Sequence, residues 1–247
     1  MKYFVLIFLL CKTLLANPIM FNSPRPKNPK AIIFFAHGLN QKASSYKNLY
    51  EYFLEKNYDV IAPIVPGHEK YKNFGSVDDG ELISFYEKVF KYIENNNPKN
   101  LPVYFLGHSF GTLGYLNNYL INGTHAKKTV LVAPALKIKF ERLLPIIPKC
   151  LGIPSLAPKE YRAFGFTPGR AYHQLLRLKT KALGELDLPS NTTIILSKKD
   201  ELVHFKNSMD LFPEAMEYTS DADLYNHYLF LPMTTLKDKT FIRNYFP

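Results

Sequence analysis

The 247-residue sequence is poor in cysteine and shows no internal repeat and no low-complexity segment. It has two cysteines, Cys11 and Cys150, and Cys11 lies within an N-terminal leader pattern. If the leader is removed, Cys150 is left alone and an internal disulfide is excluded. The remaining chain must then be stabilised by an apolar core, and its length and 47% hydrophobic content are sufficient for one.

Residues 1–16 form the leader pattern. Lys2 gives a positive start, residues 3–10 are an apolar run, and Ala16 is a small residue at the expected cleavage point. This arrangement is typical of a signal peptide, and it is shorter than a membrane-spanning helix. We therefore expect export to the periplasm or the extracellular space, with residues 17–247 as a single domain. An uncleaved leader that anchors the protein in a membrane is the alternative.

Acidic residues are fewer than basic ones, 21 against 31, which gives a net charge of +10. Cleavage after residue 16 would remove Lys2 and Lys12 and leave about +8. The lysines occur singly or in pairs such as Lys127-Lys128, with no basic stripe interleaved with aromatic residues. A generally basic, solvated surface is therefore expected rather than a nucleic-acid partner. Peripheral contact with anionic lipid is the second interpretation.

Strand and helix patterns alternate after a proline-punctuated segment at residues 17–30. Short apolar runs predict strands, and apolar residues at helical spacing predict helices between them. The predicted strands are 31–36, 59–63, 103–106, 129–133, 192–197 and 215–219, and the predicted helices include 46–54, 82–93 and 235–245. This order indicates an α/β fold with a mostly parallel sheet covered on both faces.

Residues 136–186 break the alternation, because no clear strand is found in about 50 residues. Such a long connection is typical of a functional insertion. Within it, residues 143–153 are unusually apolar and are flanked by basic side chains. Leu143, Leu144, Ile146 and Ile147 are the candidates for contact with an apolar substrate or a membrane, and an ordinary packed cap is the alternative.

The motif Gly107-His108-Ser109-Phe110-Gly111 follows the apolar run 101–106 directly. It has the form G-x-S-x-G, in which a strand turns sharply into a helix and presents a serine as a nucleophile. The glycines have a steric reason, since side chains at their positions would collide across the turn. Leu113, Leu116 and Leu120 continue at helical spacing, as the motif requires. A loop serine between two turn glycines is the simpler interpretation that this context disfavours.

A serine hydroxyl needs a base to remove its proton and an acid to orient that base. In this kind of sheet the partners follow in the order serine, acid, histidine. His227 lies after the last predicted strand and is the expected base, with His204 as its competitor and His125 and His173 as simpler surface histidines. Asp200, three residues after the strand 192–197, is the expected acid, although it also suits a helix N-cap. The alternative acids are Asp187, Asp221, Asp223 and Glu201.

The negative oxygen formed in such a reaction needs backbone N–H donors. We expect one donor at Phe110, the residue after the serine, and the other at Leu39 in the turn after the first strand. Gly38 allows close approach there, and we expect His37 to hold this turn by hydrogen bonding rather than to titrate.

These motifs resemble the α/β-hydrolases, in particular the branch with monoacylglycerol lipases, lysophospholipases and small bacterial carboxylesterases. The similarity extends over nearly all of residues 30–246. It departs from the usual pattern at Glu69, Thr112 and His204. The resemblance implies an α/β-hydrolase fold with a reduced sheet of about six strands, and a cap at about 136–186 inserted before the strand that carries the acid.

The activity that the resemblance implies is hydrolysis of lipid-like or short acyl esters through an acyl-serine intermediate. Water completes the reaction with His227 as base, so no metal or organic cofactor is expected. Two alternatives remain open. One is a serine amidase or aminopeptidase on the same fold, and the other is a non-catalytic, membrane-associated binding protein.

Overall fold

The computed structural model describes residues 25–69, 77–124, 126–155, 157–159, 161–219, 227 and 236–247. The predicted leader at 1–16 and the candidates His125, Asp221 and Asp223 lie outside these residues. No helix in the described part of the chain is long and apolar enough to cross a membrane.

Six parallel strands form the main sheet, in the order β2-β1-β3-β4-β7-β8. All six residues of β1 and five of the six in β3 are buried, as expected for central strands with helices on both faces. The prediction of a mostly parallel sheet of about six strands is confirmed. The strands are β1 (Ala31–Ala36), β2 (Tyr58–Ile61), β3 (Val103–His108), β4 (Lys128–Val132), β7 (Thr192–Leu196) and β8 (Met216–Glu217).

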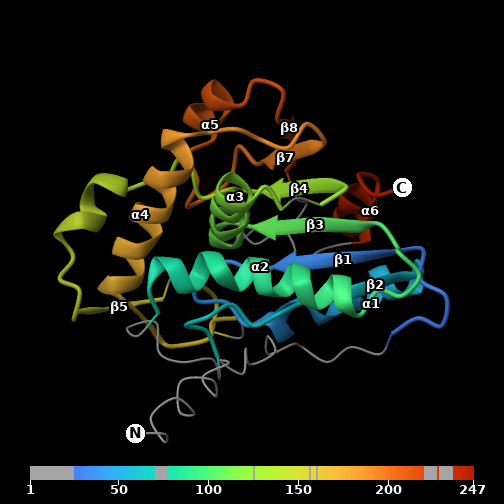
Figure 1. Cartoon of the computed structure of the whole chain (residues 1–247). Coiled ribbons are helices and arrows are strands. Elements are labelled where there is room, and N and C mark those ends of the chain that lie inside the picture. The colour runs from blue at the N-terminus through green and yellow to red at the C-terminus, as the bar shows by residue number, and fades with distance from the viewer. Residues whose placement is uncertain are drawn as a thin grey trace, which may run out of the picture.

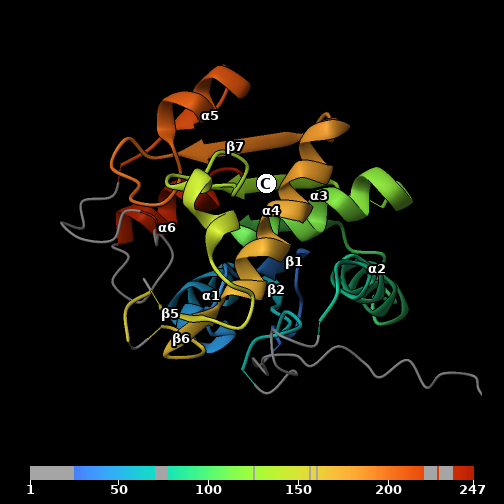
Figure 2. The same cartoon turned by 90° about the vertical axis from the view of Figure 1, so that its left-hand side faces the viewer.

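Helices cover both faces of this sheet (Figures 1 and 2). On one face α2 packs against α3, and on the other α1 contacts α6. A short 3-10 helix, η1, precedes α1, and α5 follows β7. The bounds are η1 (Ala43–Tyr46), α1 (Lys47–Glu55), α2 (Asp79–Asn95), α3 (Phe110–Asn122), α5 (Phe205–Leu211) and α6 (Leu236–Arg243).

The segment between β4 and β7 forms a cap over the carboxyl ends of the strands (Figures 1 and 2). It contains η3 (Glu141–Ile146), β5 (Gly152–Pro154), β6 (Phe166–Pro168) and α4 (Gly169–Gly184). The strands β5 and β6 pair antiparallel in a small second sheet, so the expectation of an insertion without strands was wrong. Each of these strands has three residues and a terminal proline, which leaves no alternating pattern to detect in the sequence.

The cap is tied to loops of the body of the protein by backbone hydrogen bonds, in addition to the packing of α4 against α3. Its first residues run beside the loop after β7, where Ile138 pairs with Val203 and the Lys139 N–H donates to the Leu202 carbonyl over 2.8 Å. Farther along, the Lys42 N–H donates to the Tyr161 carbonyl over 2.9 Å. The cap therefore contacts the loops at the end of β7 and the end of β1.

Candidate active site

Ser109 lies at the sharp turn between β3 and α3 and has a strained backbone, with φ 50° and ψ −117°. A Cβ at Gly107 would lie 2.6 Å from the Phe105 ring, and one at Gly111 would lie 2.5 Å from the Ala36 carbonyl oxygen. Both distances are shorter than real contacts allow, so this turn requires glycine at both positions. The requirement for glycine is confirmed, but a side chain at Gly111 would collide with the backbone at the end of β1 and not across the turn.

Ser109, His227 and Asp200 come together at the carboxyl ends of the strands. The His227 Nε2 lies 3.0 Å from the Ser109 Oγ, and its Nδ1 lies 2.9 Å from Asp200 Oδ2 and 3.0 Å from Oδ1. Asp200 and His227 are each 2% exposed, and Ser109 is 8% exposed. The geometry therefore gives a serine hydroxyl, an imidazole and a carboxylate in continuous hydrogen-bonding contact.

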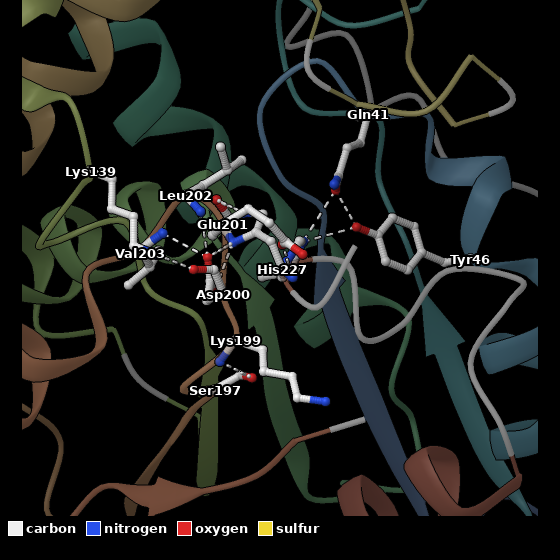
Figure 3. Close-up of polar contacts among 12 residues, drawn as sticks. Gln41, Tyr46, Lys139, Ser197, Lys199, Asp200, Glu201, Leu202, Val203 and His227 are labelled. Carbon is white, nitrogen blue, oxygen red and sulfur yellow. Dashed lines mark hydrogen bonds and ion pairs between the residues drawn. The ribbon is translucent and has the colours of Figure 1, made fainter. Parts of the chain in front are cut away.

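Asp200 is held as an ionised acceptor. Its Oδ1 accepts from the Leu202 and Val203 N–H groups, each over 2.7 Å (Figure 3). Burial by itself would raise the pKa of Asp200, but the charge of His227 and the hydrogen bonds from His227 and the two backbone N–H groups outweigh it. The pKa therefore lies below its ordinary value. Asp200 is not a helix N-cap, because α5 begins at Phe205 with His204 in that position.

His227 is also fixed through its backbone. Its N–H donates to Glu201 Oε2 over 2.9 Å, and its carbonyl accepts from His108 Nε2 over 2.6 Å. On its other side, His108 Nδ1 lies 3.0 Å from the Tyr46 hydroxyl, which also contacts Gln41 (Figure 3). Sequence reasoning had considered Glu201 only as an alternative acid and had given His108 no role. The sequence did offer a signal for these two roles, because Glu201 directly follows Asp200 and His108 directly precedes Ser109.

Lys139, one of the basic side chains that flank the apolar part of the cap, donates from its Nζ to the Asp200 carbonyl over 2.5 Å (Figure 3). The competing histidines lie elsewhere. His204 accepts from the Asn207 N–H at the start of α5, and His173 Nε2 donates to the Ile147 carbonyl within the cap. Asp187 is exposed in the segment after α4.

The turn after β1 carries Leu39 beside the serine. The Gly38 carbonyl accepts from the Gln41 N–H over 3.3 Å, and the Asn40 N–H donates to His68 Nε2 over 2.9 Å, so the peptides on both sides of Leu39 are held. His37 accepts from the Val65 N–H over 3.2 Å, in line with the bonding role expected for it. Burial lowers the pKa of His37 to about 4. Phe110 is the first residue of α3, where N–H groups point out of the helix.

A cavity of about 200 Å³ lies above Ser109 and His227. Its wall is mostly apolar, and Leu144 and Ile147 of the cap contribute to it together with Leu39 from the turn. Leu143 and Ile146 are not among the described residues that line it, and they are 55% and 74% exposed. The four apolar cap candidates therefore divide into two cavity residues and two surface residues.

Comparison with known proteins places the chain in a family. Residues 27–236 match the family model described as serine aminopeptidase, S33. A Mycoplasma pneumoniae protein named "Putative esterase/lipase 2" is 30% identical over 117 residues, which span 47% of this chain and 42% of that protein. The matched segment thus covers less than half of that relative.

Solved structures share the architecture at low sequence identity. A structure from a study of LipS and LipT, two metagenome-derived lipolytic enzymes, has a TM-score of 0.71 at 15% identity, covering 94% of this chain and 98% of that one. The Paleococcus ferrophilus monoacylglycerol lipase has a TM-score of 0.68 at 16% identity, covering 91% and 96%. Because the family model matches most of the length of this chain, the chain belongs to the serine aminopeptidase S33 family, and it has the α/β-hydrolase fold.

Proposed function

We propose that the protein is a serine hydrolase of carboxylic esters, with Ser109 as nucleophile, His227 as base and Asp200 as the acid that orients His227. The observation that carries the proposal is the continuous contact from Ser109 Oγ through both ring nitrogens of His227 to Asp200, beneath an apolar cavity. The lipase and esterase names of the compared proteins support an ester substrate.

The reaction follows from these positions. Ser109 Oγ attacks the ester carbonyl carbon while its proton passes to His227 Nε2, and the oxyanion accepts hydrogen bonds from the Leu39 and Phe110 N–H groups. The intermediate collapses by breaking the ester C–O bond, and the leaving alkoxide takes the proton from His227. Water then attacks the acyl-serine, again giving its proton to His227, and the acid is released with Ser109 restored. These steps call for no redox partner.

An ester fits the cavity better than a peptide with a free amino terminus. An aminopeptidase must hold a positively charged amine, which requires a carboxylate in the binding site. Among the described residues that line the cavity there is no aspartate or glutamate, and Lys139 is a cation. An uncharged acyl chain matches this wall of leucine, isoleucine and valine side chains.

The exposed part of the cap favours a lipid surface as the source of substrate. Phe140, Leu143, Ile146, Leu151 and Phe166 are all between 47% and 74% exposed, and all belong to the cap. Arg142 and Lys149 are exposed within the same segment. Apolar side chains next to cations match an anionic membrane surface, which takes up both.

A panel of p-nitrophenyl esters from acetate to palmitate, run beside monoacylglycerols, tests the ester specificity. We expect hydrolysis by the wild type, and a loss on the order of 10⁶ in turnover for Ser109→Ala with the melting temperature unchanged. If Ser109→Ala keeps activity within tenfold of wild type, in protein shown to be free of other esterases, the nucleophile assignment is wrong.

A further inference from the structure

A strip of the cap, residues 161–167, runs along the turn at residues 38–42. The Lys42 N–H donates to the Tyr161 carbonyl and the Ala163 N–H to the Asn40 carbonyl, each over 2.9 Å, and Gln41 pairs with Arg162 as an antiparallel bridge. The strip therefore adds backbone pairing to a turn that otherwise belongs to the body of the protein.

The Asn40 side chain makes the connection specific. Its Oδ1 accepts from the Phe164 N–H over 2.9 Å, and its Nδ2 donates to the Phe164 carbonyl over 2.9 Å and to Thr167 Oγ1 over 3.0 Å. Asn40 and Thr167 are each 2% exposed. Both polar atoms of the amide are thus satisfied by the cap strip, and its removal would leave a buried amide without these partners, which is costly.

The backbone N–H of Asn40 bonds to the body of the protein and not to the cap strip. Its N–H donates to His68 Nε2 in the body of the protein, and its φ of 54° is in the left-handed region, where asparagine is tolerated better than most residues. Asn40 directly follows Leu39, whose N–H is the proposed oxyanion donor. One residue therefore joins the cap strip, the protein body and the peptide that must point at the reacting oxygen.

We propose that Asn40 is a positioning residue that couples the seating of the cap to the geometry of the oxyanion turn. With residues 161–167 seated, the Asn40 amide is fully bonded and the Leu39 N–H is held toward the site above Ser109. If the strip lifts, the Asn40 side chain loses three hydrogen bonds and its carbonyl loses a fourth, and the turn is free to rotate away. Turnover then depends on a closed cap, and this inference rests on the proposed esterase function.

Asn40→Gly tests the coupling, because glycine keeps the left-handed backbone without strain and removes only the side-chain bonds. We expect kcat on p-nitrophenyl acetate to fall about 10- to 100-fold, as for partial loss of an oxyanion donor, with KM changed less than about threefold. Asn57→Gly is the matched control, since Asn57 also has a left-handed φ, of 61°, and lies exposed between α1 and β2. A kcat for Asn40→Gly within twofold of wild type, or an equal fall for Asn57→Gly, would overturn the proposal.

Thr167→Val is a second test of the coupling, and it changes no residue of the turn at 38–42. Valine has the shape of threonine but cannot accept the Asn40 Nδ2–H bond, so we expect a smaller fall in kcat from Thr167→Val alone. Thr167→Val also removes the Thr167 hydrogen bond with the Tyr172 hydroxyl, so Tyr172→Phe is the control and should fall less than Thr167→Val. In the double variant with Asn40→Gly, Thr167→Val should add no more than Tyr172→Phe does, because the contact with Asn40 is already lost. Fully additive losses would contradict coupling through this contact. If Asn40→Gly does not fold, an unchanged kcat in Thr167→Val overturns the proposal and a lowered one supports it.

These outcomes are distinct from failure of the proposed function. If wild-type protein and Ser109→Ala hydrolyse the ester equally, the function is wrong and the Asn40 variants have no activity to modulate. If Ser109→Ala is inactive while Asn40→Gly equals wild type, the function stands and only the coupling is refuted.

Discussion

At the scale of one residue, the charge of the Asp200 carboxylate is expected to contribute strongly to turnover. Two backbone N–H groups and both carboxylate contacts with His227 hold it as a buried anion, which is why its pKa is lowered despite burial. Asp200→Asn keeps the size but loses the charge that favours a protonated His227. We expect kcat to fall by about 10⁴-fold, as in other serine hydrolases that lose this charge.

The matched control for that substitution is Asp187→Asn, which changes an exposed aspartate that was also a candidate acid. We expect its kcat to equal that of wild type. An active Asp200→Asn protein beside an inactive Asp187→Asn protein would show that the acid had been misassigned.

The choice between the two histidines is also a residue-scale question. His227→Ala removes the only imidazole that the described residues place on Ser109 Oγ, so we expect a loss of kcat comparable to that of Ser109→Ala. His204→Ala should keep its kcat and lose at most about 1 kcal/mol of stability, because His204 caps α5 only through a 3.5 Å contact with the Asn207 N–H. Measurements of kcat and melting temperature for both variants test this choice. An active His227→Ala protein beside an inactive His204→Ala protein would exclude His227 as the base.

At the scale of elements, the cap carries two kinds of apolar side chain, and they predict different losses. Leu144 and Ile147 line the cavity, so Leu144→Ser with Ile147→Ser should weaken hydrolysis of long acyl esters in solution. Leu143 and Ile146 are on the surface, so Leu143→Ser with Ile146→Ser should weaken hydrolysis only when the ester is presented in anionic vesicles.

Hydrolysis rates measured on acetate, palmitate and vesicle-bound esters distinguish the effects of the two double variants. Acetate hydrolysis serves as the internal control and should be retained by both double variants. If the surface pair loses activity equally on every ester and melts at a lower temperature, these residues stabilise the cap and do not contact a membrane.

The elements that sequence predicts best are those with strong local patterns. The apolar run 31–36 matches β1 throughout. G-x-S-x-G locates the turn at Ser109 because neither glycine leaves room for a Cβ, Gly107 against Phe105 and Gly111 against the Ala36 carbonyl. The strands β5 and β6 are different, since three-residue strands form only by pairing with each other across the cap. The bonds from Asn40 to Phe164 and Thr167 join residues more than 120 positions apart, and no local pattern encodes them.

At the scale of the whole molecule, buried histidines predict how stability varies with pH. Burial lowers the pKa of His37 from 6.5 to about 4 and, together with the charge of His227, that of His108 to about 3, and the pKa of His68 also lies well below 6.5. These groups stay neutral in the folded protein while they take up protons in the unfolded chain. The unfolded state therefore binds more protons below pH 6.5, and stability must fall as pH falls.

We expect the free energy of unfolding to be flat above about pH 7.5 and to decrease by up to about 1.4 kcal/mol per histidine for each pH unit between 6 and 4. Urea titrations at pH 7.5, 6 and 5 measure this decrease. Asn57→Gly, which removes an exposed side chain that does not titrate, should show the same slope as wild type. Equal unfolding free energies at pH 7.5 and pH 5 would mean that these histidines are not buried in neutral form.

The central claim is that one side chain, Ser109, becomes covalently acylated with His227 as its base. The most direct test is labelling of the native protein with a fluorophosphonate, followed by intact mass and peptide mapping. The account predicts one label per chain, on the peptide that contains Ser109, and little labelling of His227→Ala or of denatured protein. No labelling of folded wild type, or a label on another residue that persists in Ser109→Ala, would contradict it.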